Sequence, residues 1–139
     1  MVFKIFLDAN ILLDFLLKRA NYNNAKNVID LAIKGKAKAF ITPSIVHIVG
    51  YWLSKSYGTK TAKELLLTLL IDVNVIEIDH GITLLALHSK IDDIEDALQY
   101  YTALHHQLDF FISEDKVFQK SSMPTLPVVS AEYFLQYIN

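Results

Sequence analysis

Three aspartates that are far apart in the sequence stand at positions from which they can act on one substrate. Asp8 directly follows the apolar run at 3–7, and Asp115 comes shortly after a second apolar run, FFIS, at 110–113. Asp96 lies near the start of a segment with helical periodicity. Carboxylates without cysteine ligands form a hard-oxygen site, which suits Mg²⁺ or Mn²⁺. Such a site supports metal-assisted attack of water on a phosphodiester.

The apolar pattern predicts that a parallel sheet brings two of these aspartates together. The run at 3–7 is almost continuously apolar, which is typical of a strand covered on both faces. Further strands are expected at 36–41, 74–79, 110–113 and 126–129, with helices between them. This alternation predicts an α/β fold, a three-layer α/β/α sandwich on a mostly parallel sheet of about five strands. Ligands of such sheets bind beyond the carboxyl ends of the strands, where Asp8 and Asp115 are expected.

Each strand-end aspartate also has a purely structural explanation. Asp8 can cap the helix that follows it, since aspartate is a favoured N-cap residue and Ile11, Leu12 and Phe15 then repeat at helical spacing. Asp115 can start the turn that follows its strand. From the residues alone, the capping and the catalytic explanations of Asp8 both stay open.

The acidic segment at 92–96 can likewise be structural, because acids in a first helical turn complement the helix dipole. We expect Asp92 to cap this helix. Its core face is predicted from apolar residues at helical spacing, namely Ile94, Ala97, Leu98, Tyr101 and Leu104. Asp79 is expected to cap another helix, and Asp109, which precedes its strand, is expected at the opposite edge of the sheet.

Size and composition favour one compact domain over residues 1–139. Hydrophobic residues make up 53% of the chain and charged residues 20%, which argues against disorder. The absence of cysteine excludes a disulfide framework and a thiolate metal site, so a reducing cytoplasm is the expected location. Asp8 and Asp14 interrupt the apolar N-terminus, and the leucine run at 65–71 is too short to cross a bilayer, so no membrane association is expected.

A net charge of −2 gives the chain no general affinity for nucleic acid, so any such binding must come from local patches. We expect phosphate contacts from basic residues near the predicted site, namely Lys18, Arg19, Lys55 and Lys116. Tyr51 and Tyr57 are candidates for stacking on bases, whereas Trp52 fits the buried stripe of its helix better. Lys34, Lys36 and Lys38 are expected on an ordinary solvated face.

Three segments resemble the acidic motifs of the PIN domain family, in the family's order and at similar spacing: LDANILLDFLLKR, DDIEDALQYYTALHHQ and DFFISEDKVFQK. The resemblance covers essentially the whole chain. It implies an Mg²⁺- or Mn²⁺-dependent ribonuclease acting on single-stranded RNA. Small single-domain members resemble VapC toxins, which implies an antitoxin partner and a homodimer.

The resemblance also implies site residues. It assigns metal binding and catalysis to Asp8, Asp96 and Asp115. It assigns supporting positions to Asn10, Asp93, Glu95 and Ser113, the last in the place of the family's hydroxyl residue.

One departure from the family pattern concerns the helix after the second strand, which usually carries a glutamate. Here no Asp or Glu occurs between Asp30 and Glu64, and His47 lies about where the glutamate belongs, one turn after Ser44. An imidazole can bind Mn²⁺ or transfer a proton, so a weaker, Mn²⁺-leaning nuclease is expected. The alternative is a packed helix histidine without a role in the site.

Two other functions compete with the nuclease. The missing glutamate favours a weakened PIN-like module that binds RNA or a protein partner. A haloacid-dehalogenase-like phosphatase also begins with an aspartate after its first strand, but it needs a second aspartate two residues later as general acid. Asn10 occupies that position and cannot donate the proton, which disfavours the phosphatase.

Overall fold

The computed structural model describes residues 1–139 and contains a five-stranded sheet in the order β3-β2-β1-β4-β5. Every neighbouring pair of strands is parallel. The strands are β1 (Phe3–Leu7), β2 (Ala37–Ile41), β3 (Val73–Val75), β4 (Phe110–Ile112) and β5 (Val128–Val129). The helices are α1 (Ala9–Leu16), α2 (Tyr22–Ile33), α3 (Pro43–Tyr57), α4 (Thr59–Leu69), α5 (His80–His88), α6 (Ile94–His105), α7 (Lys116–Lys120) and α8 (Ala131–Ile138). The predicted α/β sandwich on a parallel sheet is confirmed.

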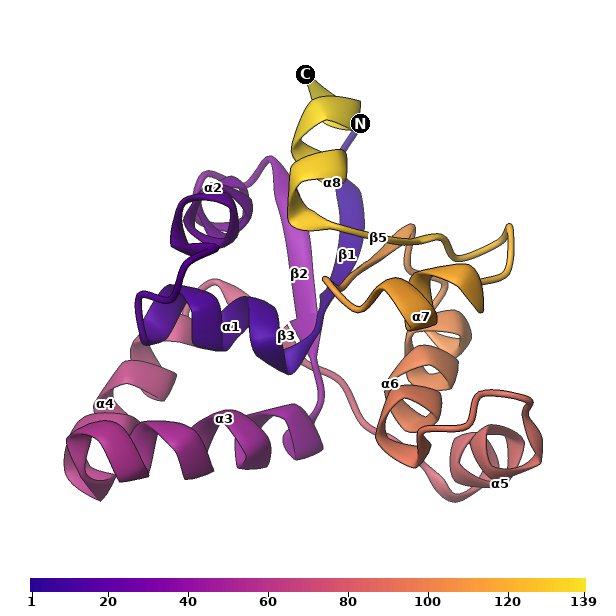
Figure 1. Ribbon diagram of the computed structural model, residues 1–139, viewed down its shortest axis with the longest axis horizontal. Coiled ribbons are helices and arrows are strands. Elements are labelled where there is room, and N and C mark those ends of the chain that lie inside the picture. The colour runs from indigo at the N-terminus through magenta and orange to yellow at the C-terminus, as the bar shows by residue number, and fades with distance from the viewer.

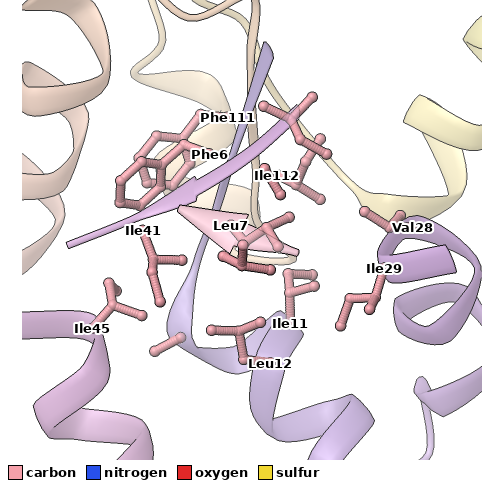
Figure 2. Close-up of a cluster of buried hydrophobic side chains, with 14 of the residues drawn as sticks. Phe6, Leu7, Ile11, Leu12, Val28, Ile29, Ile41, Ile45, Phe111 and Ile112 are labelled. Carbon is pink, nitrogen blue, oxygen red and sulfur yellow. The ribbon is translucent and has the colours of Figure 1, made fainter. Parts of the chain in front are cut away.

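Helices cover both faces of the sheet, with α1 and α2 on one side and α6 on the other (Figure 1). Phe6 and Phe111 are paired across β1 and β4 and stack with ring centroids 4.6 Å apart. Tyr100 of α6 packs against Phe111, so this face of the sheet meets α6. Figure 2 shows the two phenylalanine rings together and Leu7 near Ile11 of α1, among the side chains of the core. The central strand β1 is therefore buried on both faces, as its apolar run predicts.

The strand order reverses next to β1. The chain moves outward from β1 through β2 to β3, and then returns to the other side of β1 to form β4 and β5. In open α/β sheets such a reversal leaves a crevice at the carboxyl ends of the two strands. The backbone N–H of Asp8 donates to the carbonyl of Ile112 over 3.1 Å, which closes the pairing of β1 and β4 at this edge. The fold thus places the residues after β1 and β4 side by side.

Helix α6 differs from its sequence prediction in its cap and in its buried face. Asp93, and not Asp92, is the N-cap, and its carboxylate accepts from the N–H of Asp96. Ile94 is 61% exposed, so the predicted apolar stripe was wrong at this position. Relative to the prediction, the helix is rotated about its axis, because polar side chains on the buried face form hydrogen bonds there. The residues it buries are Ala97, Gln99, Tyr100, Thr102 and Ala103.

The fit of Tyr100 shows why apolar periodicity failed on this helix. The ring is fully buried, while its hydroxyl donates to the carbonyl of Leu126 and accepts from the N–H of Met123, each over 2.7 Å. A buried tyrosine is stable when its hydroxyl is bonded in this way. No pattern of apolar residues contains this information.

Two further predictions were wrong in detail. Trp52 is 45% exposed, because α3 buries the stripe of Ile45, Val49 and Leu53, one residue every turn. Strand β3 ends at Val75 instead of continuing to residue 79. Helix α4 has Gly58, at φ 85°, as its N-cap. Glycine adopts this positive φ at a lower cost than other residues, because it has no Cβ.

Other predictions are confirmed. Asp79 caps α5 and accepts from the N–H of Ile82. Asp109 accepts from the N–H of Lys4 over 2.8 Å, which places it at the edge of the sheet opposite Asp8. Ser130 is the N-cap of α8. None of the helices combines the length and the apolar character that a membrane span requires.

Candidate active site

Asp8 is held by one donor from its own helix and by one from the neighbouring strand. It is the N-cap of α1, and its Oδ1 accepts from the N–H of Ala9 over 2.8 Å. Its Oδ2 accepts from the hydroxyl of Ser113, which follows β4, also over 2.8 Å. Burial raises the pKa of Asp8, and the bonds from Ser113 and Ala9 partly oppose this rise. The capping explanation is confirmed, and the same carboxylate also faces the end of β4.

Asp115 lies on the other side of the same serine. Its N–H donates to the Ser113 hydroxyl over 3.2 Å. As N-cap of α7 it accepts from the N–H groups of Val117 and Phe118 at Oδ1 alone, which leaves Oδ2 without a partner in the chain. Ser113 is fully buried and connects the two strand-end aspartates.

Asp96 lies in the first turn of α6, and no group of the chain donates a hydrogen bond to its carboxylate. Its pKa is raised to about 7, first by burial and then by the negative charges of Asp93, Asp8, Asp115 and Glu95. No lysine, arginine or histidine offsets these charges at Asp96. The carboxylates after β1, after β4 and on α6 therefore act on one another without a compensating cation.

The donor chemistry at this edge fits Mg²⁺ or Mn²⁺. The groups that face one another there are carboxylate and hydroxyl oxygens, which these hard cations prefer. The side chains are not already drawn together around an ion, since no three Asp, Glu or His residues form a ready-made ligand set. Asp8, Asp96 and Asp115 have the right chemistry, and unpartnered oxygens remain on Asp96 and Asp115.

A buried network beside Asp96 was missed by the sequence analysis. The Gln99 amide donates from Nε2 to Ser44 Oγ over 2.5 Å and to Glu95 Oε1 over 2.6 Å. Its Oε1 accepts from the Thr42 hydroxyl over 2.5 Å. Thr42 follows β2 at the same edge as Asp8, so the strand-end rule that singled out Asp8 also indicates Thr42. Gln99 carried no such signal, because its position on the helix looked like a solvated one.

The sequence of this chain matches the sequence model described as PIN domain over residues 4–117. The chain belongs to the PIN domain family. No curated protein sequence matches this PIN domain.

Several solved structures share the fold of this PIN domain. They include VapBC2 from Rickettsia felis bound to promoter DNA, with a TM-score of 0.67 and 17% identity over 90% of this chain and 96% of that one. A toxin–antitoxin complex from Klebsiella pneumoniae has a TM-score of 0.67 and 21% identity, covering 88% and 94% of the two chains. VapC20 from Mycobacterium tuberculosis, a toxin that cleaves the sarcin–ricin loop, has a TM-score of 0.68 and 14% identity, covering 88% and 98%. At these identities the likeness establishes the fold.

The supporting residues expected in this PIN domain take different positions. Asp93 is exposed and caps α6, whereas Glu95 belongs to the buried network. Asn10 is exposed and its side-chain oxygen accepts from Arg19 over 3.4 Å. His47 is exposed on α3, and no hydrogen bond joins it to the acidic residues. The expectation that His47 replaces the missing glutamate stays a prediction.

A groove lined by both polar and apolar side chains runs between α3 and α4 of the PIN domain. It has a volume of about 510 Å³, and its lining contains no carboxylate. The Lys55 ammonium lies 4.9 Å from the centre of the Tyr51 ring. The lining residues are Val46, His47, Gly50, Tyr51, Ser54, Lys55, Thr59, Ala62, Lys63 and Leu66.

A second, mainly apolar cavity of about 300 Å³ lies between α1, α2 and α4. Its lining is Phe15, Leu16, Lys18, Tyr22, Ile29, Ile33, Leu65, Thr68, Leu69 and Asp72. Lys18, one of the basic residues expected to contact phosphate, lies at this cavity. Lys116 is the first residue of α7 and is exposed directly beside Asp115.

Proposed function

We propose that this PIN domain is a divalent-metal-dependent endoribonuclease that cleaves phosphodiester bonds of single-stranded RNA. One observation supports the proposal. The negative charges of Asp8, Asp96 and Asp115 repel one another, and no cation of the chain offsets this repulsion. PIN domain proteins are generally ribonucleases, so the family gives the reaction type. Charges left unbalanced at the carboxyl edge of a parallel sheet support a cationic cofactor there.

Asp8, Asp96 and Asp115 would hold the Mg²⁺ or Mn²⁺ ion. When bound, the ion supplies a water of lowered pKa and neutralises negative charge on the phosphate. Ser113 and the N–H of Ala9 fix both oxygens of Asp8, and the first turn of α7 fixes Oδ1 of Asp115. These bonds hold two carboxylates in place before substrate arrives, which lowers the reorganisation that binding requires. In the metal-free chain the pKa of Asp96 is about 7, because burial and the neighbouring carboxylates disfavour its charged form.

The groove between α3 and α4 supports RNA as the substrate. The first turn of α3 carries Ser44, which contacts Glu95, and the helix continues through His47 and Tyr51 to Lys55. The groove therefore leads away from the acidic residues along one helix. Lysines attract the phosphate chain, and an exposed aromatic ring offers a stacking surface for a base. Lys116, next to Asp115 at the start of α7, supplies a further positive charge near the acidic residues.

We further propose that the protein is the toxin of a toxin–antitoxin pair, acts in the cytoplasm and forms a homodimer. Two of the structures that share its fold are described as toxin–antitoxin complexes. The apolar cavity beside Phe15, Tyr22 and Ile33 offers an antitoxin segment a surface away from the acidic residues. Ile33 is 54% exposed there, which favours cover by an apolar side chain.

The direct test is cleavage of a labelled single-stranded RNA in Mn²⁺, in Mg²⁺ and in EDTA. We expect cleavage with either metal and none in EDTA. Asp8→Asn, Asp96→Asn and Asp115→Asn should each lower the rate by at least about a hundredfold, as loss of a ligand or its orientation does in metalloenzymes. Asp92→Asn is the matched control. Asp92 is exposed in the loop before α6, and its charge is not among those that raise the pKa of Asp96. It should cleave like the wild type.

The second candidate function is an RNA-binding PIN module without catalysis. The absence of any acid on α3 favours it. RNA binding by the wild type without cleavage in either metal would support this alternative and contradict the nuclease.

A further inference from the structure

We propose that Glu95 on α6 supplies the acid that α3 lacks, and that Gln99 and Ser44 hold it in that place. The proposal rests on the proposed function, since it adds one carboxylate to the same metal site. The missing acid would lie near the beginning of α3, beside the end of β2. The carboxylate of Glu95 lies there, although it belongs to α6.

Glu95 reaches across to α3 through its Oε1 atom. This oxygen accepts from Gln99 Nε2 over 2.6 Å and lies 3.5 Å from Ser44 Oγ, the donor on the first turn of α3. The other oxygen, Oε2, has no hydrogen-bond partner in the chain. The side chain is thus anchored by one oxygen and offers the second, as Asp115 does on α7.

Gln99 determines where Glu95 points. Its side chain is 1% exposed, and every polar group of its amide has a partner. Both Nε2 hydrogens are used, one for Ser44 and one for Glu95, and Oε1 accepts from Thr42. A buried amide is costly unless all its groups are bonded, so this orientation is strongly preferred. Gln99 therefore connects the end of β2, the start of α3 and the first turn of α6. Its bond to Oε1 fixes the position of that oxygen of Glu95.

The charge of Glu95 acts on the proposed site. It is among the charges that act on both Asp8 and Asp96. No cation of the chain neutralises it, because the one ion pair in the protein joins Lys26 and Asp30 on α2. A carboxylate that served only to brace two helices would gain from a basic partner. Glu95 instead has neutral donors on one oxygen, and its charge acts on other carboxylates.

The experiment measures Mn²⁺ affinity by isothermal titration calorimetry without RNA. Glu95→Gln removes the charge but keeps a side-chain oxygen that can accept from Gln99 and Ser44, so a bracing role would survive it. We expect Mn²⁺ affinity to fall on the order of tenfold or more, with an unchanged melting temperature in EDTA. Asp92→Asn carries the same change of charge in the preceding loop and should bind Mn²⁺ like the wild type.

A rescue variant tests the location. Ser44 Oγ lies beside Glu95 Oε1, so adding Ser44→Glu to Glu95→Gln returns a carboxylate to the site from α3 and should recover most of the lost affinity. His47→Glu in the same background should not. Gln99→Met tests the positioning role, because Glu95 and Thr42 each keep another partner. It should weaken Mn²⁺ binding less than Glu95→Gln does.

Wild-type affinity in Glu95→Gln, or rescue by His47→Glu in place of Ser44→Glu, would overturn the proposal and leave the proposed function intact. A wild-type chain that neither binds Mn²⁺ nor cleaves RNA would overturn both.

Discussion

The hydroxyl of Ser113 donates to Oδ2 of Asp8 over 2.8 Å, and the same oxygen of Ser113 accepts from the N–H of Asp115 over 3.2 Å. One buried serine therefore sets the relative position of two aspartates that follow different strands. It also stabilises the charged form of Asp8 against the effect of burial.

Removing this hydroxyl should shift the pH dependence of catalysis. In Ser113→Ala, Asp8 loses a donor that lowers its pKa, so the carboxylate is protonated up to a higher pH. Loss of a hydrogen bond to the charged form should therefore move the acid limb of the pH–rate profile to higher pH. Rates measured across pH in Mn²⁺ test this. Ser121→Ala, a matched change at the C-cap of α7, should leave the profile in place. An unshifted limb in Ser113→Ala would contradict the assignment.

Asp96 should make the metal-free protein less stable as pH rises. Its pKa is about 7 in the folded chain against an ordinary 3.8, so between these values the folded state binds more protons than the unfolded state. The free energy of unfolding then falls with increasing pH. We expect Asp96→Asn to melt a few degrees above the wild type at pH 8 in EDTA and to show no gain at pH 3.5.

Thermal melts at the two pH values test this expectation, with Asp92→Asn as control. The metal provides a second check. Saturating Mn²⁺ should raise the wild-type melting temperature at pH 8 and not that of Asp96→Asn. An equal gain for Asp96→Asn at both pH values would show that the effect does not come from its charge.

The groove between α3 and α4 should contribute phosphate contacts. In Lys55→Ala with Lys63→Ala, two charges of the lining are lost, so the slope of log affinity against log salt for single-stranded RNA should become shallower by about 1.4. Fluorescence anisotropy of a labelled oligouridine in EDTA measures binding without cleavage. Lys34→Ala with Lys36→Ala removes the same charge from exposed positions elsewhere and should keep the wild-type slope.

The protein should form a homodimer in solution. Leu84, Leu85 and Leu87 on α5 are 47%, 58% and 58% exposed, because α5 buries Ile82 and Ala86 and leaves three leucines uncovered. Contiguous apolar surface of this kind often marks an interface. Light scattering at micromolar concentration should give twice the mass of the chain, and a single-chain mass would refute the prediction.

The sequence was sufficient for the parts of the structure that follow from local patterns. The apolar run before Asp8 identified β1, and strand-end reasoning placed Asp8 and Asp115 at one edge and Asp109 at the other. The face of α6 could not be found in this way. Its rotation depends on partners for Gln99 and Tyr100 that lie 57 and 26 residues away in the chain, and apolar periodicity contains no information about them.

The pairing of β1 with β4 also fixes when activity can arise during synthesis. Ser113, the partner of Asp8, is made 105 residues after it. Contacts between such distant parts of a chain form late in folding. A nascent chain that ends before β4 has neither Ser113 nor Asp115 and holds Asp8 with its helix alone. We therefore expect any RNA cleavage by a nascent chain to begin only after β4 and Asp115 have been translated.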